Sequence, residues 1–244
     1  MWERSQAFLV WWSLVLAVAY GLTLGLLLHM VGPPSATLTA DQVAVFYREH
    51  QTSIRAGAML ASWTGMFIAP LWCVLAAQIW RQEQGRTPVW TITAGSLGPM
   101  MGLFLAAPPI CWGVAAFTPT RAPEITATFH ELGVLTFVTT DQIFVFNFAA
   151  VVAIALLPQA ADYSPFPRWY GYFSLFWALV FEVGAVGFVT KVGPFSWNGL
   201  FVFWLPVIGA SIWIPATAVL LLRALKRQRL AATGTPAPAL PVKA

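Results

Sequence analysis

The chain has 244 residues, of which 59% are hydrophobic, 15% are aromatic and only 9% are charged. A soluble domain is roughly 45–50% apolar and about 25% charged. This composition therefore disfavours a soluble globular enzyme, a disordered chain and a nucleic-acid-binding protein, and it indicates a protein that crosses a membrane several times. The net charge of +4 comes from basic residues in loops and near the C-terminus, so we expect no nucleic-acid partner.

Six stretches are long and apolar enough to cross a membrane, which requires about 20 predominantly apolar residues. In chain order they are residues 8–31, 56–80, 89–107 with an irregular continuation to 117, 130–157, 169–190 and 198–222. We therefore predict an all-α fold, a polytopic membrane protein with a six-transmembrane-helix bundle in residues 1–230. Residues 231–244 are rich in Pro, Ala and Thr, which predicts a disordered cytoplasmic tail.

The longest loop between spans, residues 32–55, contains a helix signal. Thr39 is followed three residues later by Gln42, which is the pattern of a capping box. The short helix expected over residues 40–51 carries apolar side chains on one side: Val43, Phe46 and Tyr47. Such an amphipathic helix suits the membrane surface or the mouth of the bundle.

The lysines and arginines predict the orientation of the chain. With the N-terminus inside the cell, nine of the 13 lie on the inner side and four on the outer side. The four outer residues are Arg48, Arg55, Arg121 and Lys191. Because cytoplasmic loops are enriched in Lys and Arg, we predict a multi-pass inner-membrane protein with both termini in the cytoplasm.

Small residues recur at four-residue spacing in the second and third spans. They are Gly57, Ala61, Gly65 and Ala69 in the second span, and Gly98, Gly102 and Ala106 in the third. Lipid gives helices no hydrophobic reason to associate, so close approach through small residues matters. We predict that these two spans are antiparallel neighbours in contact.

Two acidic residues, Asp141 and Glu182, lie deep inside predicted spans. At a rise of about 1.5 Å per residue, Asp141 is about 16 Å and Glu182 about 20 Å from the start of its span. A charge at this depth costs at least about 2.5–3.5 kcal/mol, so each acid is expected to face the interior, to be paired or to be protonated. Both acids, with His130, are candidate acid–base residues; the alternative is a structural hydrogen bond between helices.

Aromatic and polar residues surround Asp141 in the same span. The candidate ligand-binding residues among them are Thr140, Phe144, Asn147 and Phe148. Aromatic side chains can form the wall of a pocket for an apolar or cationic species. A pocket at this level of the membrane is therefore one prediction of the sequence.

The three histidines, His29, His50 and His130, all fall at the predicted outer end. Neutral imidazole is a common ligand of transition metals, and two histidines on different helices can hold a haem. No metal-binding spacing occurs within one helix, so we expect no cofactor. A transition metal, a haem, an acid–base role and a purely interfacial role remain open for these three residues.

No nucleotide-binding loop, zinc-protease motif or serine-hydrolase motif occurs in the chain. The first hypothesis is a bundle or subunit that binds a small apolar or amphipathic ligand in a pocket containing Asp141 and Glu182. The alternatives are an enzyme that acts on a lipid or isoprenoid by acid–base chemistry, an accessory subunit of a membrane complex, and a metal or haem redox protein. The expected partners are the lipid bilayer, a small apolar ligand and another membrane protein.

Overall fold

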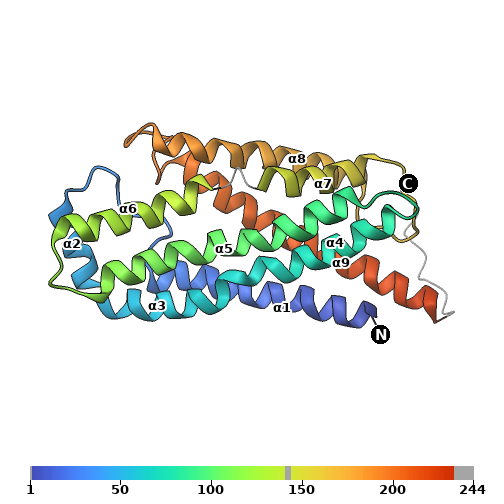
Figure 1. Cartoon of the computed structure of the whole chain (residues 1–244), viewed down its shortest axis with the longest axis horizontal. Coiled ribbons are helices and arrows are strands. Elements are labelled where there is room, and N and C mark those ends of the chain that lie inside the picture. Colours follow the sequence, from blue (N-terminus) through green and yellow to red (C-terminus); the bar gives the residue numbers. More distant parts are fainter. Residues whose placement is uncertain (1, 141–143, 234–244) are drawn as a thin grey trace, which may run out of the picture.

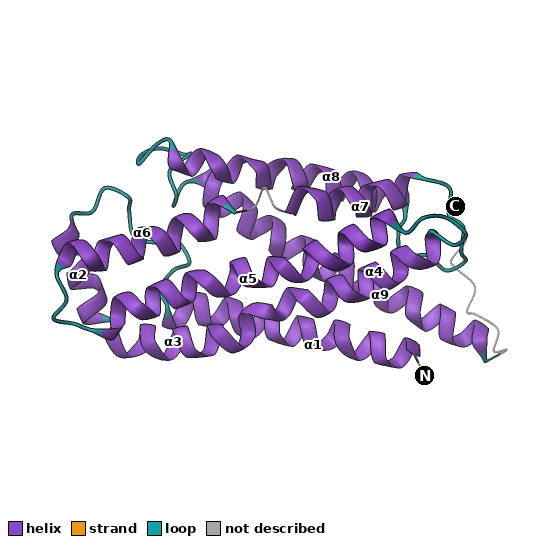
Figure 2. Cartoon of the chain, in the orientation of Figure 1, coloured by secondary structure: helices purple, strands orange, loops and turns teal. Residues whose placement is uncertain are grey.

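The computed structural model describes residues 2–140 and 144–233, and within these ranges every regular element is a helix (Figures 1 and 2). Five stretches are long and apolar enough to cross a membrane: Trp2–Leu27, Gln51–Gln82, Val89–Phe117, Arg168–Phe188 and Leu200–Ala232. A shorter apolar helix, Val145–Leu156, accompanies them. The protein is an all-helical membrane bundle, as the sequence predicts.

Several of the long stretches change helix type along their length. The first comprises α1 (Trp2–Leu22) and a π-helical turn, η1 (Thr23–Leu27). The second comprises α3 (Gln51–Thr64), a 3-10 turn, η2 (Gly65–Phe67), and α4 (Ile68–Gln82). The third is the single helix α5 (Val89–Phe117). The fourth comprises α8 (Arg168–Glu182) and the 3-10 segment η4 (Val183–Phe188), and the fifth comprises the π-helical turn η5 (Leu200–Trp204) and α9 (Leu205–Ala232). The shorter helices are α2 (Ala40–Glu49), α6 (Pro123–Thr139) and α7 (Val145–Leu156).

The beginning of α1 and the end of α9 lie at the same end of the bundle, which we call the terminal end (Figure 1). The short helix α2 lies at the opposite end, the α2 end. Helix α9 runs two residues past the predicted boundary at residue 230. The predicted tail lies almost entirely in residues 234–244, outside the described residues.

The helix predicted in the long loop is confirmed as α2. The side chain of Thr39 accepts a hydrogen bond from the backbone N–H of Gln42, and the Gln42 side chain accepts one from the backbone N–H of Thr39. Val43 and Tyr47 on the apolar side are buried. Helix α2 therefore packs over the mouth of the bundle, mainly against α6.

The predicted contact between the second and third spans is also confirmed. A Cβ atom added to Gly65 would lie 3.1 Å from Cα and Cβ of Ala106, and one added to Gly98 would overlap the side chain of Trp72. Gly57 instead faces the end of the first helix, at Leu28. The part of the third span that was expected to be irregular, residues 108–117, is regular helix. Helix α5 contains three prolines and continues past all of them to Phe117.

The fourth span is not the continuous helix that residues 130–157 predict. Helix α6 begins earlier, with Pro123 in its first turn, and ends at Thr139; α7 begins at Val145. The hydroxyls of Thr139 and Thr140 donate hydrogen bonds to the carbonyls four residues earlier, at 2.6 and 2.8 Å. Such side-chain bonds compete with the helical ladder and satisfy carbonyls at a helix end. They help to explain why the helix stops there.

Candidate ligand-binding site

A cavity of about 110 Å³ lies beside the interruption between α6 and α7. All of the described residues that line it are apolar; they come from η2, α4 to α9 and η5, and from Phe144 just before α7. Its aromatic members are Phe67, Phe137, Phe144, Phe148, Phe181, Phe203 and Trp213. We call this cavity the aromatic pocket.

Ring contacts and one hydrogen bond hold the wall of the aromatic pocket in place. Trp213 stacks on Trp72 at a centroid distance of 5.6 Å and meets Phe148 edge-on at 5.0 Å. The indole N–H of Trp213 donates to the hydroxyl of Ser174 over 3.0 Å. Phe148 also contacts Phe181 at 5.6 Å. Rings fixed by several neighbours form a wall that exists before any ligand arrives, as is usual for ligand sites.

The four candidate ligand-binding residues occupy different environments. Phe144 and Phe148 line the aromatic pocket. The Thr140 hydroxyl donates to the carbonyl of Thr136, outside that lining. Asn147 is completely buried on α7, and neither atom of its amide has a hydrogen-bond partner among the described residues.

The structure describes only one of the two predicted acids. Asp141 lies outside the described residues. Glu182 is half-buried and is the last residue of α8, directly after Phe181 of the pocket wall and directly before the 3-10 segment η4. A Cβ atom added to Gly187 in η4 would lie 3.6 Å from side-chain atoms of Val138 and Thr139, so η4 packs against the end of α6.

His130 lies away from the aromatic pocket, near the α2 end. It is nine residues from the end of α6, or about 14 Å along the helix axis. The hydroxyl of Tyr47 and Nδ1 of His130 form a buried hydrogen bond of 3.0 Å, and Trp197 packs edge-on against the imidazole. Burial raises the pKa of Tyr47, so the phenol stays neutral. The bond therefore anchors α2 to α6.

The other two histidines form a separate pair. The rings of His29 and His50 are 4.4 Å apart, and Nε2 of His29 is 3.3 Å from the hydroxyl of Ser53. Nδ1 of His50 hydrogen-bonds to the carbonyl of Phe46 at 3.0 Å. Across residues 2–140 and 144–233, no three His, Cys, Asp or Glu side chains are grouped as metal ligands. The cofactor alternatives thus gain no support from the arrangement of these histidines.

The residues that η5 and α9 contribute to the aromatic pocket were not among the candidates predicted from the sequence. Phe203, Pro206, Ala210 and Trp213 line it and recur every three or four residues. This spacing places them on one face of a helix, and it was the available signal. This spacing does not stand out in the sequence, because apolar residues occur on all sides of this helix.

Comparisons with protein-family models, with curated proteins and with solved structures find no match to this chain. No relative therefore supplies a substrate, a cofactor or a set of site residues.

Proposed function

We propose that this membrane protein binds a small apolar molecule, or the apolar end of an amphipathic one, in the aromatic pocket. The observation that carries this proposal is the cavity of about 110 Å³ with an entirely apolar described lining. Ligand sites are typically concave, largely apolar and already formed before binding. A pocket walled by fixed aromatic rings beside a helix interruption has these properties.

The size of the pocket limits the ligand. An apolar cavity of about 150 Å³ is known to stay dry and to bind benzene. A cavity of about 110 Å³ therefore accepts a group of roughly one ring or a short branched hydrocarbon segment. A larger amphipathic ligand would insert only its apolar end.

The ligand would reach the pocket from the bilayer. Phe137, Val207 and Ile214 line the pocket and are only half-buried, which supports an opening on the side of the bundle. The amide of Asn147 is buried next to Phe148 and has no hydrogen-bond partner among the described residues, but it is not part of the pocket lining.

Photolabelling tests this proposal. Ala210 lines the pocket, whereas its neighbour Ser211 is exposed on the outside of α9. Trifluoromethyl phenyl diazirine, an apolar probe whose phenyl ring matches the size of the pocket, is expected to label Phe148 and Trp213, which are buried from lipid. Ala210→Phe should fill the pocket and abolish this labelling, while Ser211→Phe should preserve it.

The labelling experiment also has outcomes that would refute the proposal. Labels confined to lipid-facing residues in the wild type would mean that the pocket does not accept the probe. Equal labelling of Phe148 in the Ala210→Phe and Ser211→Phe variants would mean that the probe reaches this residue by another route. Thermal unfolding of each variant in detergent checks that the bundle is intact.

We also propose that the terminal end faces the cytoplasm of a cell with an inner membrane. Eight described lysines and arginines belong to the loops and helix ends at the terminal end, against four at the α2 end. This asymmetry supports the orientation through the positive-inside tendency. A fluorescent protein fused to the C-terminus should fluoresce and an alkaline phosphatase fusion should be inactive; the reverse pattern would contradict the orientation.

A further inference from the structure

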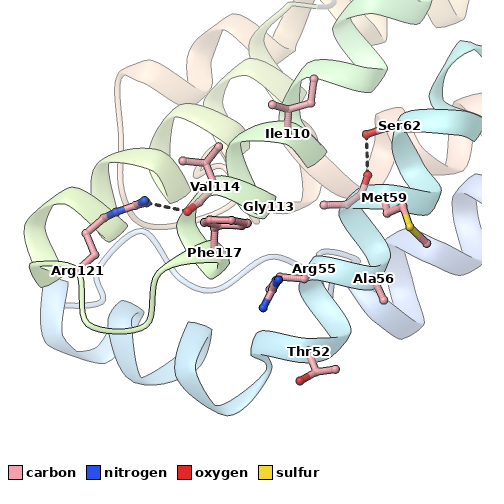
Figure 3. A pocket seen from close by; sticks show the side chains of 11 residues that line it. Thr52, Arg55, Ala56, Met59, Ser62, Ile110, Gly113, Val114, Phe117 and Arg121 are labelled. Atoms are coloured by element: carbon pink, nitrogen blue, oxygen red, sulfur yellow. Dashed lines mark hydrogen bonds between the residues drawn. The ribbon is translucent and has the colours of Figure 1, made fainter.

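A second and larger hollow lies on the side of the bundle, between α3 and α5 near the α2 end. Its volume is about 790 Å³, several times that of the aromatic pocket. Residues that line it include Arg55, Met59, Ile110, Val114, Phe117 and Arg121 (Figure 3). We call it the side groove.

The floor of the side groove is closed by direct contact between the two helices. A Cβ atom added to Gly113 of α5 would lie 2.7 Å from Cβ of Ala58 of α3. Met59 and Ile110 form exposed apolar walls on either side of this contact. The groove is therefore a long apolar recess that faces lipid rather than a passage through the bundle.

Two guanidinium groups lie at the end of the groove nearest α2. Arg55 lies over the ring of Phe117, with Cζ 5.2 Å from the ring centroid. Arg121 donates from Nη1 to the carbonyl of Val114 over 2.7 Å (Figure 3). Its guanidinium also lies over the ring of Phe129, with Cζ 5.6 Å from the ring centroid. Aromatic faces hold both cations in position.

The two arginines differ in how many of their guanidinium N–H groups already donate hydrogen bonds to the protein. The guanidinium of Arg121 already donates two hydrogen bonds at the end of α5, one to the carbonyl of Val114 and one to the hydroxyl of Thr118. Arg55 forms no hydrogen bond or ion pair with the described residues, and the described lining contains no acidic side chain. The mouth of the groove is therefore positively charged, with Arg55 as its available donor.

The charge and the apolar walls are arranged along the axis of α3, a helix long and apolar enough to be part of a membrane span. Ser62, at the far end of the groove, is seven residues beyond Arg55 on α3, which is about 10 Å along the helix axis. The cationic mouth thus lies at the level of lipid headgroups and the apolar part extends toward the acyl chains. This gradient is complementary to an amphipathic molecule with an anionic head.

We propose that the side groove is a selective binding site for an anionic membrane lipid. The phosphate of the lipid binds at Arg55, with Arg121 nearby, and one acyl chain lies along Met59 and Ile110. Arginine suits this role because its planar guanidinium donates two parallel hydrogen bonds to a phosphate. Basic pockets between membrane helices bind anionic headgroups for the same reason.

Native mass spectrometry of the detergent-solubilised protein tests the site. Phosphatidylglycerol and phosphatidylcholine with identical acyl chains are added in turn, and lipid adducts are counted. We expect a preference for phosphatidylglycerol that falls by about tenfold in Arg55→Gln, the effect of losing one hydrogen bond between charged groups. The matched control is Arg48→Gln, which removes an exposed arginine of α2 outside the groove and should keep the preference.

A third variant tests the apolar part of the groove. Met59 is exposed on the groove wall, so Met59→Trp should fill the recess, reduce binding of both lipids and leave thermal unfolding unchanged. Glycerol phosphate, the headgroup without chains, should not displace the bound lipid.

Three results would overturn the lipid site: equal binding of the two lipids by the wild type, an equal loss in Arg48→Gln and Arg55→Gln, or displacement by glycerol phosphate alone. The Ala210→Phe variant should bind phosphatidylglycerol normally. The lipid site and the aromatic pocket can therefore fail separately.

Discussion

The bundle has a continuous half, made of α3, η2, α4 and α5, and an interrupted half, made of α6, α7, α8 and η4 (Figure 1). In the continuous half, small residues let helices approach until Gly98 meets Trp72 and Gly65 meets Ala106. In the interrupted half, α6 stops at Thr139 and the aromatic pocket remains beside the gap. Close packing through small residues leaves only the side groove on the lipid-facing surface of α3 and α5, whereas the end of α6 inside the bundle leaves an internal pocket.

The largest expected effect comes from adding a methyl group in the continuous half. A Cβ atom at Gly98 would overlap Cβ and Cγ of Trp72, which is completely buried and has no room to move. Gly98→Ala should lower the free energy of unfolding by about 3 kcal/mol, at the upper end of the usual cost of overpacking. Thermal unfolding in detergent would measure this loss.

Two other glycines serve as controls for that experiment. A Cβ atom at Gly95 would lie in ordinary contact with Ala76 at 3.5 Å, and one at Gly187 of η4 would lie 3.1 Å from Val202. Gly95→Ala should therefore be nearly neutral, and Gly187→Ala should cost less than about 1 kcal/mol. If Gly187→Ala cost as much as Gly98→Ala, η4 would be packed as tightly against its neighbours as α5 is against α4, and the predicted difference between these two contacts would be wrong.

A smaller effect is expected at the wall of the aromatic pocket. Ser174→Ala removes the hydroxyl that accepts a hydrogen bond from the indole of Trp213. Because both residues are buried, the indole N–H would lose its partner, at a cost of about 1–2 kcal/mol. Ser211→Ala, on the exposed side of α9, is the control. Unchanged unfolding and unchanged diazirine labelling in Ser174→Ala would show that this bond does not fix the wall.

The smallest effect on stability is expected for His29 at the α2 end, which belongs to neither half. Burial first, and the charge of His50 second, hold the pKa of His29 below its ordinary value of 6.5. The folded state thus binds a proton less readily than the unfolded state, so His29 destabilises the fold as the pH falls below about 6.5 and has no such effect above it. His29→Gln should therefore reduce the loss of thermal stability that occurs below about pH 6.5. An unchanged pH profile would contradict this role.

The sequence predicted the elements that depend on local chemistry. The capping box at Thr39 predicted α2, and hydropathy predicted the long spans, because both signals lie within one segment of chain. The glycine stripes predicted the contact between the second and third spans. The pairing of His29 with His50 and of Tyr47 with His130 could not be predicted, because each joins segments that only tertiary packing brings together.

The interruption and the pocket were harder to predict for a physical reason. Residues 130–157 are apolar throughout most of their length and contain no proline, so hydropathy gives no stop signal before residue 157. The polar run of Thr139, Thr140, Asp141 and Gln142 was the local hint of an interruption. On α9, the face that lines the pocket and the face that meets lipid are both apolar, so the membrane removes the contrast that marks a core in water.

A crystal structure under xenon pressure would show whether the aromatic pocket receives a small apolar ligand, because xenon enters dry apolar cavities. We predict xenon density in the aromatic pocket, in contact with Phe144, Phe148 and Trp213, in the wild type but not in Ala210→Phe. A wild-type pocket without xenon, while xenon binds elsewhere in the same crystal, would contradict the proposal that this site receives a small apolar ligand.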